Sequence, residues 1–310
     1  MKRSHSDYLC APVNFNFMFS LVKPDDINKI IDKLKSKTST GIDGISNKIL
    51  KGIKSAIIEP LTLIINQIFT TGIFPHRLKQ AKVIPLYKKD DNFLLKNYRP
   101  ISILPTISKV AERIMFNQLH SHLHELNIYY KSQYGFRKHH STELAALELI
   151  DRVSKNMDKG ETPINIYLDL SKAFDTLDHE ILINKLAYYG IYGSSLNLFK
   201  SYLSNRTQSV HFNNFSSSEL IIKTGVPQGS ILGPLLFIIY INDICHASSL
   251  FYPIIYADDT TLSATLNTFT TQENAQNINN ELEKISTWLK LNKLSLNASK
   301  TKAMVFHMPQ

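Results

Sequence analysis

Cysteine is almost absent from this sequence, since only Cys10 and Cys245 occur among its 310 residues. Two cysteines cannot build a disulfide framework, and neither has a second cysteine at metal-ligand spacing. Long apolar runs are also lacking, because the longest, residues 235–241, is far shorter than the roughly 20 residues of a membrane-spanning helix. No apolar stretch of signal-peptide type follows residues 1–3. We therefore expect a soluble intracellular protein, in the nucleus or cytoplasm, that is not secreted and has no membrane partner.

Acidic charge is scarce relative to basic charge. The chain has 35 Lys and Arg against 26 Asp and Glu, a formal net charge of +9, and most of the excess lies between residues 77 and 140. Aromatic side chains such as Tyr87 and Tyr98 are interleaved with basic ones there, a mixture that binds phosphates and stacks bases. With 43% hydrophobic residues the chain is long enough for about two structural units. We expect a folded protein with a nucleic-acid partner.

Three aspartates follow two short runs of β-type residues. Asp169 directly follows residues 164–168, and Asp258 and Asp259 directly follow residues 251–257. Carboxylates at the ends of neighbouring strands can bind two hard cations about 3.5–4 Å apart, which supports phosphoryl transfer. Asp258 and Asp259 can act together only if the chain turns sharply there and residues 260–264 return as a strand. Taken separately, these residues could also be an acidic hairpin turn and a strand-end cap.

Apolar periodicity predicts the other elements. Helices are predicted at residues 27–34, 49–61, 107–126, 144–157, 178–189 and 275–289, and a strand at residues 81–86. A loop punctuated by Gly and Pro, residues 224–230, opens onto the longest apolar run.

Six blocks of the sequence resemble reverse transcriptases, in the order of that family. Residues 166–175 (IYLDLSKAFD) and 256–259 (YADD) look like the two palm motifs, and the other blocks are residues 97–102 (NYRPIS), 133–137 (QYGFR), 225–234 (GVPQGSILGP) and 294–301 (LSLNASKT). The resemblance extends over almost the whole chain from about residue 25. The residues of these blocks are most similar to those of non-long-terminal-repeat retrotransposons of the jockey type.

The resemblance implies an α+β right-hand polymerase fold. An N-terminal extension would occupy residues 1–24, helical basic fingers residues 25–160, and an antiparallel palm sheet residues 161–310. The implied reaction is reverse transcription: a DNA primer 3′-hydroxyl attacks a deoxynucleoside triphosphate opposite an RNA template, and pyrophosphate leaves. The last palm block and the helical thumb have no counterpart before Gln310, so we expect a truncated domain with its catalytic carboxylates intact.

The same resemblance assigns the catalytic centre. Asp169 and Asp258 would bind two Mg²⁺ ions, for which Mn²⁺ could substitute, with Asp259 as an auxiliary ligand. The carbonyl of Leu170 would contact the metal of the nucleotide. Lys300 would protonate the departing pyrophosphate or hold its charge, although without the motif it would be an ordinary surface lysine.

Substrate-binding residues are implied in the same way. Phe174 would lie under the incoming sugar and exclude a 2′-hydroxyl, although aromatic residues more often serve core packing. The other nucleotide contacts would be Gln228, Arg99 and Lys88. Template and primer would meet Arg137, Gly225 and Gly229, the glycines because they allow close backbone approach. The alternative for residues 224–230 is an ordinary turn without a role in binding.

Two other interpretations stay open at this point. One is an RNA-templated polymerase of another lineage, such as an intron maturase or a viral RNA polymerase, although Phe174 argues against the use of ribonucleotides. The other is a non-catalytic nucleic-acid-binding remnant that kept the fingers and lost turnover.

Overall fold

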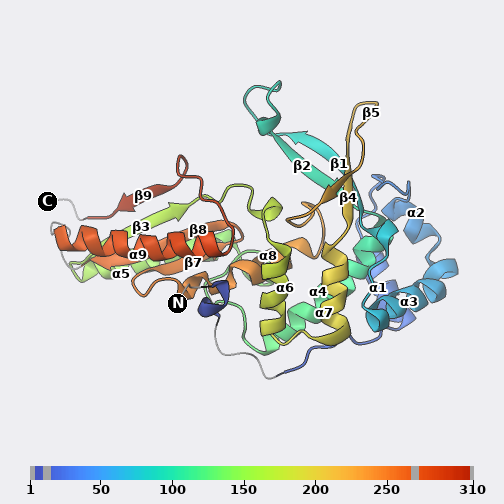
Figure 1. Cartoon of the computed structure of the whole chain (residues 1–310), viewed down its shortest axis with the longest axis horizontal. Coiled ribbons are helices and arrows are strands. Elements are labelled where there is room, and N and C mark those ends of the chain that lie inside the picture. The colour runs from blue at the N-terminus through green and yellow to red at the C-terminus, as the bar shows by residue number, and fades with distance from the viewer. Residues whose placement is uncertain (1–3, 10–14, 267–271, 308–310) are drawn as a thin grey trace. The chain divides into compact units, whose positions relative to one another are not determined.

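The structure is a computed structural model that describes residues 4–9, 15–266 and 272–307. The chain divides into two compact units that alternate along the sequence (Figure 1). Unit 1 consists of Met1–Pro12, Asn127–Lys185 and Phe237–Gln310, and unit 2 consists of Val13–Leu126 and Leu186–Leu236. Two of the four boundaries between the units fall inside helices, one in α6 (His179–Tyr188) and one in α8 (Gly233–Ile241).

Unit 1 contains a four-stranded antiparallel sheet in the order β7-β8-β3-β9. The strands are β3 (Thr162–Leu168), β7 (Tyr252–Tyr256), β8 (Asp259–Leu266) and β9 (Lys302–Val305). Both faces of β3 are largely buried, which explains its nearly continuous apolar sequence. The antiparallel sheet expected within residues 161–310 is therefore present.

Helices cover the sheet of unit 1. α5 (Thr142–Asp158) packs against β3 and β7, and α9 (Gln272–Leu291) contributes the buried side chains of Ile285, Trp288 and Leu289. The longest apolar run of the sequence forms α8, whose side chains are buried all round, as a core helix requires. Short 3₁₀ segments complete the unit: η1 (His5–Tyr8), η4 (Ala173–Asp175) and η5 (Asn242–His246).

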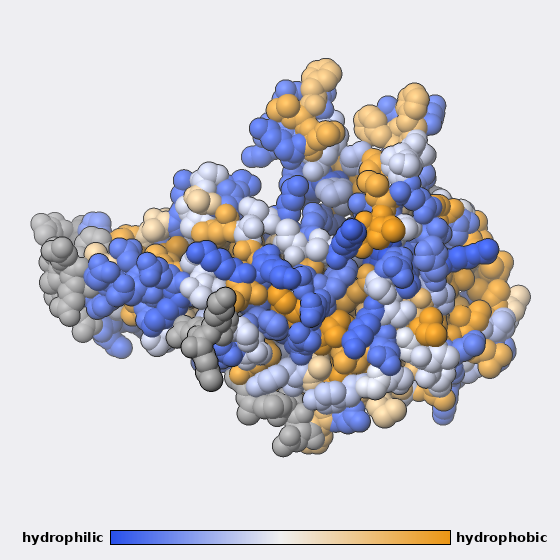
Figure 2. All heavy atoms as spheres, in the orientation of Figure 1, coloured by the Kyte–Doolittle hydropathy of each residue, from blue (hydrophilic) through white to orange (hydrophobic). Residues whose placement is uncertain are grey.

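Unit 2 is built around a second sheet, in the order β2-β1-β4-β5 with β6 also paired to β4. Its strands are β1 (Gln80–Tyr87), β2 (Tyr98–Ile103), β4 (Arg206–Phe212), β5 (Phe215–Ser216) and β6 (Leu220–Ile222). β1 and β2 form an antiparallel hairpin, whereas β1 and β4 run parallel. Exposed apolar side chains gather at the free ends of the β1–β2 and β4–β5 hairpins (Figure 2), among them Phe93 and Leu95 between β1 and β2 and Phe215 at the start of β5.

The remaining helices of unit 2 pack on one another. They are α1 (Pro24–Lys33), α2 (Asn47–Gly52), α3 (Lys54–Thr71), α4 (Thr106–Glu125) and α7 (Gly193–Leu203), with 3₁₀ segments η2 (His76–Leu78) and η3 (Leu95–Asn97). α1 begins with a proline at its first turn followed by Asp25 and Asp26, which favour a helix N-terminus. Its apolar face buries Ile27 and Ile31 completely.

The predicted elements are confirmed with two differences. The helix expected over residues 49–61 is interrupted, because Ile53 leaves the helical conformation between α2 and α3, next to Gly52, a weak helix former. Several elements were not predicted, namely the helices α7 (Gly193–Leu203) and α8 and the strands β2, β4, β5, β6 and β9. β2 contains Pro100, which argues against a strand in general, but β2 lies at the edge of its sheet, where a missing N–H is tolerated.

Within the residues that the structure describes, no helix is long and apolar enough to cross a membrane. The fingers and palm boundaries expected near residues 25 and 160 stay predictions, because compactness of a unit says nothing about its function.

Candidate active site

A sharp turn carries two of the three predicted aspartates. β7 and β8 are joined by the two residues Ala257 and Asp258, and Tyr256 pairs with Asp259 directly behind the turn. Ala257 has a φ of 59°, a left-handed conformation that alanine adopts at a cost. The turn that the sequence analysis required for Asp258 and Asp259 to act together is therefore present.

The third aspartate lies beside this hairpin. The last pair of β3 and β8 is Leu168 with Thr260, so Asp169 and Asp259 are each the next residue beyond that pair, at the same end of the sheet. Burial raises the pKa of Asp259, and the charges of Asp258 and Asp169 raise that pKa further. Asp259 is thus close enough to the other two carboxylates to be affected by their charges.

The backbone around Asp169 is fixed by residues 295–301. The Asp169 carbonyl accepts a 2.8 Å hydrogen bond from the Asn297 N–H, and the Ser171 N–H donates to the Ser295 carbonyl at 2.8 Å. These bonds make Leu170 and Leu296 a non-hydrogen-bonded antiparallel pair, so the Leu170 carbonyl points away from Leu296 and toward the side on which β8 lies. That direction agrees with the predicted metal contact of Leu170, which stays a prediction.

Lys300 extends from the same segment toward Asp169. Its ammonium nitrogen is 3.9 Å from a carboxylate oxygen of Asp169, and its side chain is 69% exposed. An exposed ion pair of this length adds little stability. It does place a positive charge near the carboxylate of Asp169.

The three aspartates are the candidate ligands for a metal ion. Among the residues that the structure describes, no three or more acidic, histidine or cysteine side chains are grouped closely enough to hold a metal ion. The chemistry of Asp169, Asp258 and Asp259 nevertheless fits hard divalent cations, which prefer oxygen ligands, and their mutual repulsion would be relieved by positive charge. The ion-binding arrangement stays a prediction.

Phe174 lies in η4, five residues beyond Asp169. Its ring stacks on buried Phe237, with 4.7 Å between centroids, and meets the edge of Phe136 at 6.2 Å. Phe174 is only half-buried, so it has both a packing contact and an accessible part. This placement is compatible with both the predicted role against the 2′-hydroxyl and the packing alternative.

Arg137 makes several contacts within its own loop. Its Nη1 group donates to the carbonyls of Tyr130 at 3.1 Å and Gln133 at 2.9 Å, and the guanidinium lies 5.1 Å from the ring centroid of Tyr129. Burial lowers the pKa of Arg137. One nitrogen of this side chain therefore supports the loop, and the predicted template contact would have to use the others.

Two predicted nucleotide contacts share one face of the β1–β2 hairpin in unit 2. Leu86 pairs with Arg99, and the Lys88 N–H donates to the Asn97 carbonyl at 2.9 Å, which continues the register. Lys88 and Arg99 are therefore diagonal neighbours, with Cβ atoms about 7 Å apart. Both side chains are exposed. The hairpin presents two positive charges together.

The glycine-containing loop predicted at residues 224–230 is held against β2. The Gln228 carbonyl accepts a 2.7 Å hydrogen bond from the Ser102 N–H. A Cβ at Gly229, whose φ is 120°, would lie 2.5 Å from the Ser102 carbonyl, so only glycine fits there. Gly225 also has positive φ. Gly229 thus permits close approach of two backbones within the protein, and the approach of Gly225 and Gly229 to substrate stays a prediction.

Glu112 was not singled out by the sequence analysis, yet it anchors the end of this loop. Its side chain is fully buried, and one oxygen accepts hydrogen bonds from the N–H groups of Ile231 at 2.6 Å and Leu232 at 3.4 Å. The other oxygen accepts from the Tyr202 hydroxyl at 3.1 Å. Burial raises the pKa of Glu112, and the nearby charge of Arg206 opposes that rise. A charged residue at helical spacing from buried Met115 was the available signal.

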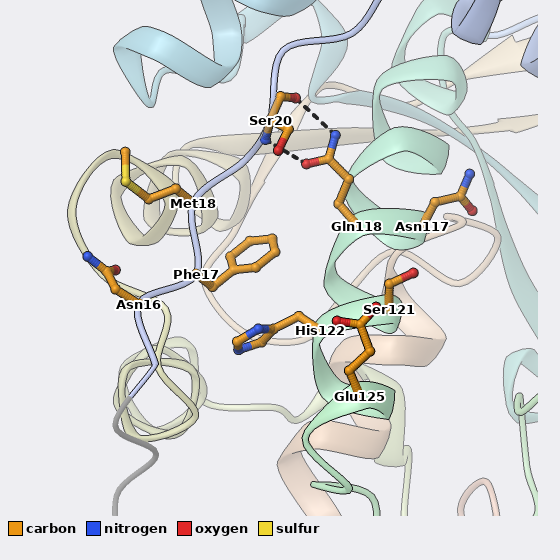
Figure 3. Close-up of a pocket in the computed structure, with 9 residues that line it drawn as sticks. All are labelled: Asn16, Phe17, Met18, Ser20, Asn117, Gln118, Ser121, His122 and Glu125. Atoms are coloured by element: carbon orange, nitrogen blue, oxygen red, sulfur yellow. Dashed lines mark hydrogen bonds between the residues drawn. The ribbon is translucent and has the colours of Figure 1, made fainter.

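A separate hollow of about 500 Å³ lies in unit 2 between α4 and the chain before α1 (Figure 3). Its polar groups bind one another: the Gln118 amide exchanges hydrogen bonds of 2.8 Å and 3.0 Å with the backbone of Ser20. Phe17 faces His122, with 5.0 Å between ring centroids. None of the predicted site residues lines this hollow.

Comparison with known proteins identifies the family. The sequence profile of the reverse transcriptase (RNA-dependent DNA polymerase) family matches residues 86–308, which include every predicted site residue. The chain belongs to the reverse transcriptase family, and its relatives place it with the domains of non-long-terminal-repeat retrotransposons. The mixed arrangement of sheets and helices is compatible with the fold of that family.

Three relatives from Drosophila melanogaster show how far the similarity extends. The chain is 32% identical over 309 residues to a probable RNA-directed DNA polymerase from transposon BS, covering 95% of the chain and 33% of that protein. It is 30% identical over 243 residues to the RNA-directed DNA polymerase from mobile element jockey, covering 78% and 26%. A probable RNA-directed DNA polymerase from transposon X-element is 28% identical over 311 residues, covering 97% and 33%. The chain spans a third or less of the length of these relatives.

Proposed function

We propose that this chain carries out RNA-templated DNA synthesis as part of a non-long-terminal-repeat mobile element. The observation that supports this most directly is the convergence of Asp169, Asp258 and Asp259 at the ends of β3 and the β7–β8 hairpin, in a member of the reverse transcriptase family. The substrates would be an RNA template, a DNA primer and deoxynucleoside triphosphates. In this proposal the sheet β7-β8-β3-β9 serves as the palm, and the β1–β2 hairpin belongs to the fingers.

Asp169 and Asp258 would hold two Mg²⁺ ions, or Mn²⁺, with Asp259 as an auxiliary ligand and the Leu170 carbonyl as a further oxygen donor. Bound there, the ions would activate the primer hydroxyl and stabilise the charge that develops on the phosphate and the leaving pyrophosphate. The proton or charge of the departing pyrophosphate would be managed by Lys300, whose ammonium group already lies beside Asp169.

The remaining residues would position the substrates. Arg99 and Lys88 would bind the triphosphate, since a guanidinium group offers bidentate hydrogen bonds to phosphate. Phe174 and Gln228 would contact the incoming nucleotide. Template and primer would lie against Arg137, Gly225 and Gly229.

The test is extension of a DNA primer on an RNA template with Mg²⁺ and deoxynucleotides. The parent should extend the primer, and Asp169→Asn should abolish extension. Asp151→Asn is the matched control, because it makes the same chemical change on the exposed face of α5 and should leave extension intact.

Other outcomes select the other interpretations. RNA binding that weakens with salt and survives Asp258→Asn, without extension by the parent, would indicate a non-catalytic nucleic-acid-binding protein. Incorporation of ribonucleotides as efficient as that of deoxynucleotides would indicate an RNA-templated polymerase of another lineage.

A further inference from the structure

Gln133 is a buried side chain that contacts the catalytic turn without having been assigned a role. It is only 1% exposed. Its Oε1 atom accepts two hydrogen bonds, from the Gly135 N–H at 2.8 Å and from the Ala257 N–H at 3.2 Å. Ala257 is the first residue of the turn whose second residue is Asp258, so Gln133 binds the backbone immediately before a predicted metal ligand.

The backbone around Gln133 continues the sheet of unit 1. The Ile255 N–H donates to the Ser132 carbonyl at 2.9 Å, and the Tyr134 N–H donates to the Ile255 carbonyl at 2.7 Å, so residues 132–134 pair with β7 in parallel. In a regular parallel ladder the next donor, the Ala257 N–H, would bind the Tyr134 carbonyl. It binds the Gln133 side chain instead. The side chain therefore takes over the ladder at the point where β7 turns.

Gly135 presses on the same place from the other end of the segment. A Cβ at Gly135 would lie 2.1 Å from the Ala257 nitrogen, which no side chain can tolerate. Ala257 itself is held at a φ of 59° although it is not glycine. A residue in this conformation persists only where its surroundings determine it, and here those surroundings are Gln133 and Gly135.

We propose that Gln133 is a positioning residue for the catalytic centre: its side-chain carbonyl holds the Ala257 N–H and thereby fixes the turn that orients Asp258 and Asp259. This inference rests on the proposed function for its catalytic part. The acceptor oxygen does the work, because the Nε2 group of Gln133 has no hydrogen-bond partner among the described residues. A side chain of the same size without an acceptor would leave two buried N–H groups unpaired.

The main variant is Gln133→Met, which keeps the size of the side chain and removes the acceptor. Gln118→Met is the matched control, because it also removes two hydrogen bonds of a glutamine side chain, those to Ser20 in unit 2, and should leave kcat unchanged. Gln133→Met should lower kcat by about tenfold or more, because small displacements of catalytic groups have effects of that order. The KM for deoxynucleotide and the affinity for RNA template should change by less than about threefold.

Amide hydrogen exchange of the metal-free protein supplies a readout that needs no activity. In Gln133→Met the Ala257 amide should exchange at least about tenfold faster, while amides in the middle of β3 keep their protection. Gln133→Glu retains an acceptor oxygen at the same position and should keep the Ala257 amide protected. This variant also serves if Gln133→Met fails to fold, since loss of protection in a folded Gln133→Glu protein would contradict the proposed hydrogen bond.

Ala257→Gly tests the strain. Glycine adopts positive φ freely, so the turn should depend less on the hydrogen bond to Gln133. Ala257→Gly should therefore restore part of the kcat lost in Gln133→Met. The proposal is overturned if Ala257 exchanges at the parent rate in Gln133→Met, or if exchange accelerates while kcat stays at the parent value. If the parent extends no primer, the proposed function fails, and the exchange experiment alone then decides whether Gln133 holds the turn.

Discussion

Asp259 and Asp169 are each the next residue beyond the last pair of β8 and β3, Thr260 with Leu168, so the two carboxylates lie at the same end of the sheet. Burial raises the pKa of Asp259, and the charges of Asp258 and Asp169 raise that pKa further. The arrangement costs stability unless positive charge joins it. A group of residues that is unfavourable alone is typical of a functional site.

The three aspartates should differ in their importance. Asp258→Asn is expected to lower the rate of primer extension by about a thousandfold or more, because Asp258 is proposed as a primary metal ligand. Asp259→Asn should cost much less, since Asp259 is assigned an auxiliary role. Single-turnover extension rates at saturating Mg²⁺ measure both. An equal loss in the two variants would show that the roles of Asp258 and Asp259 are wrongly divided.

Phe174 should set the choice of sugar. Phe174→Val is expected to raise the ratio of ribonucleotide to deoxynucleotide incorporation by about tenfold or more, because the smaller side chain leaves room for a 2′-hydroxyl. Ratios of kcat/KM for matched nucleotides provide the measurement. Phe215→Val, on a side chain that is 81% exposed, is the control and should leave the ratio unchanged. A general loss of activity at an unchanged ratio would instead support a packing role against Phe237.

Glu112 should make stability depend on pH. Burial raises its pKa, so the folded state holds a proton that the unfolded state loses as pH rises above the ordinary glutamate range. The free energy of unfolding contributed by this group therefore falls between its unfolded and folded pKa values. The difference in stability between Glu112→Gln and the parent should shift in favour of the variant as pH rises through that window. Urea unfolding from pH 4 to pH 8 measures it, and parallel curves would contradict the prediction.

Glu112 should also hold the loop that carries Gln228. Glu112→Ala removes the acceptor of the Ile231 and Leu232 N–H groups and is expected to destabilise the protein by about 3 kcal/mol, since each orphaned buried group costs about 1–3 kcal/mol. If the loop positions the nucleotide, the KM for deoxynucleotide should rise in the same variant at temperatures where it remains folded. Unchanged stability would show that the loop is held by other contacts.

A buried ion pair stabilises the core of unit 1. The Lys185 ammonium is fully buried, lies 2.6 Å from the Asp243 carboxylate and also donates to the Tyr240 carbonyl at 2.5 Å. Lys185→Met leaves Asp243 uncompensated and should destabilise the protein by about 3–5 kcal/mol. Lys155→Met, which breaks the exposed pair with Asp151, should cost less than about 1 kcal/mol.

The double variant Lys185→Met with Asp243→Leu completes this test. Removing both charges should recover most of the stability lost in Lys185→Met, because neither partner is then left buried alone. Denaturant midpoints measure all three variants. No recovery in the double variant would show that Lys185 stabilises the core through its contact with Tyr240 rather than through the charge of Asp243.

The carboxylate site could be predicted from sequence because its parts are local. Each aspartate ends an apolar run, and the need for a tight turn at Asp258 follows from strand geometry alone. Glu112 and Gln133 could not be assigned in this way, since their partners are backbone N–H groups far along the chain, at Ile231 and Ala257. Every residue except proline has a backbone N–H, so the residue type does not reveal which one binds a side chain.

The sheet of unit 2 illustrates the same limit. β4 pairs in parallel with β1, from which it is separated by two strands and four helices, β2, α4, α5, β3, α6 and α7. Local alternation of side chains does not reveal such a partner. β2 was masked by Pro100, a residue that only its edge position accommodates. Position within a sheet is decided by the rest of the fold.

The alternation of the two units along the chain has a consequence for synthesis on the ribosome. Every segment of unit 2 precedes Phe237, whereas β3 pairs only with β8 and β9, which are made later. Unit 2 can therefore fold while translation continues. Asp169 is synthesised before the hairpin that carries Asp258 and Asp259. The three aspartates can therefore come together only after every segment of unit 2 has been made, so a chain released before Asp258 contains unit 2 but lacks two of the three aspartates.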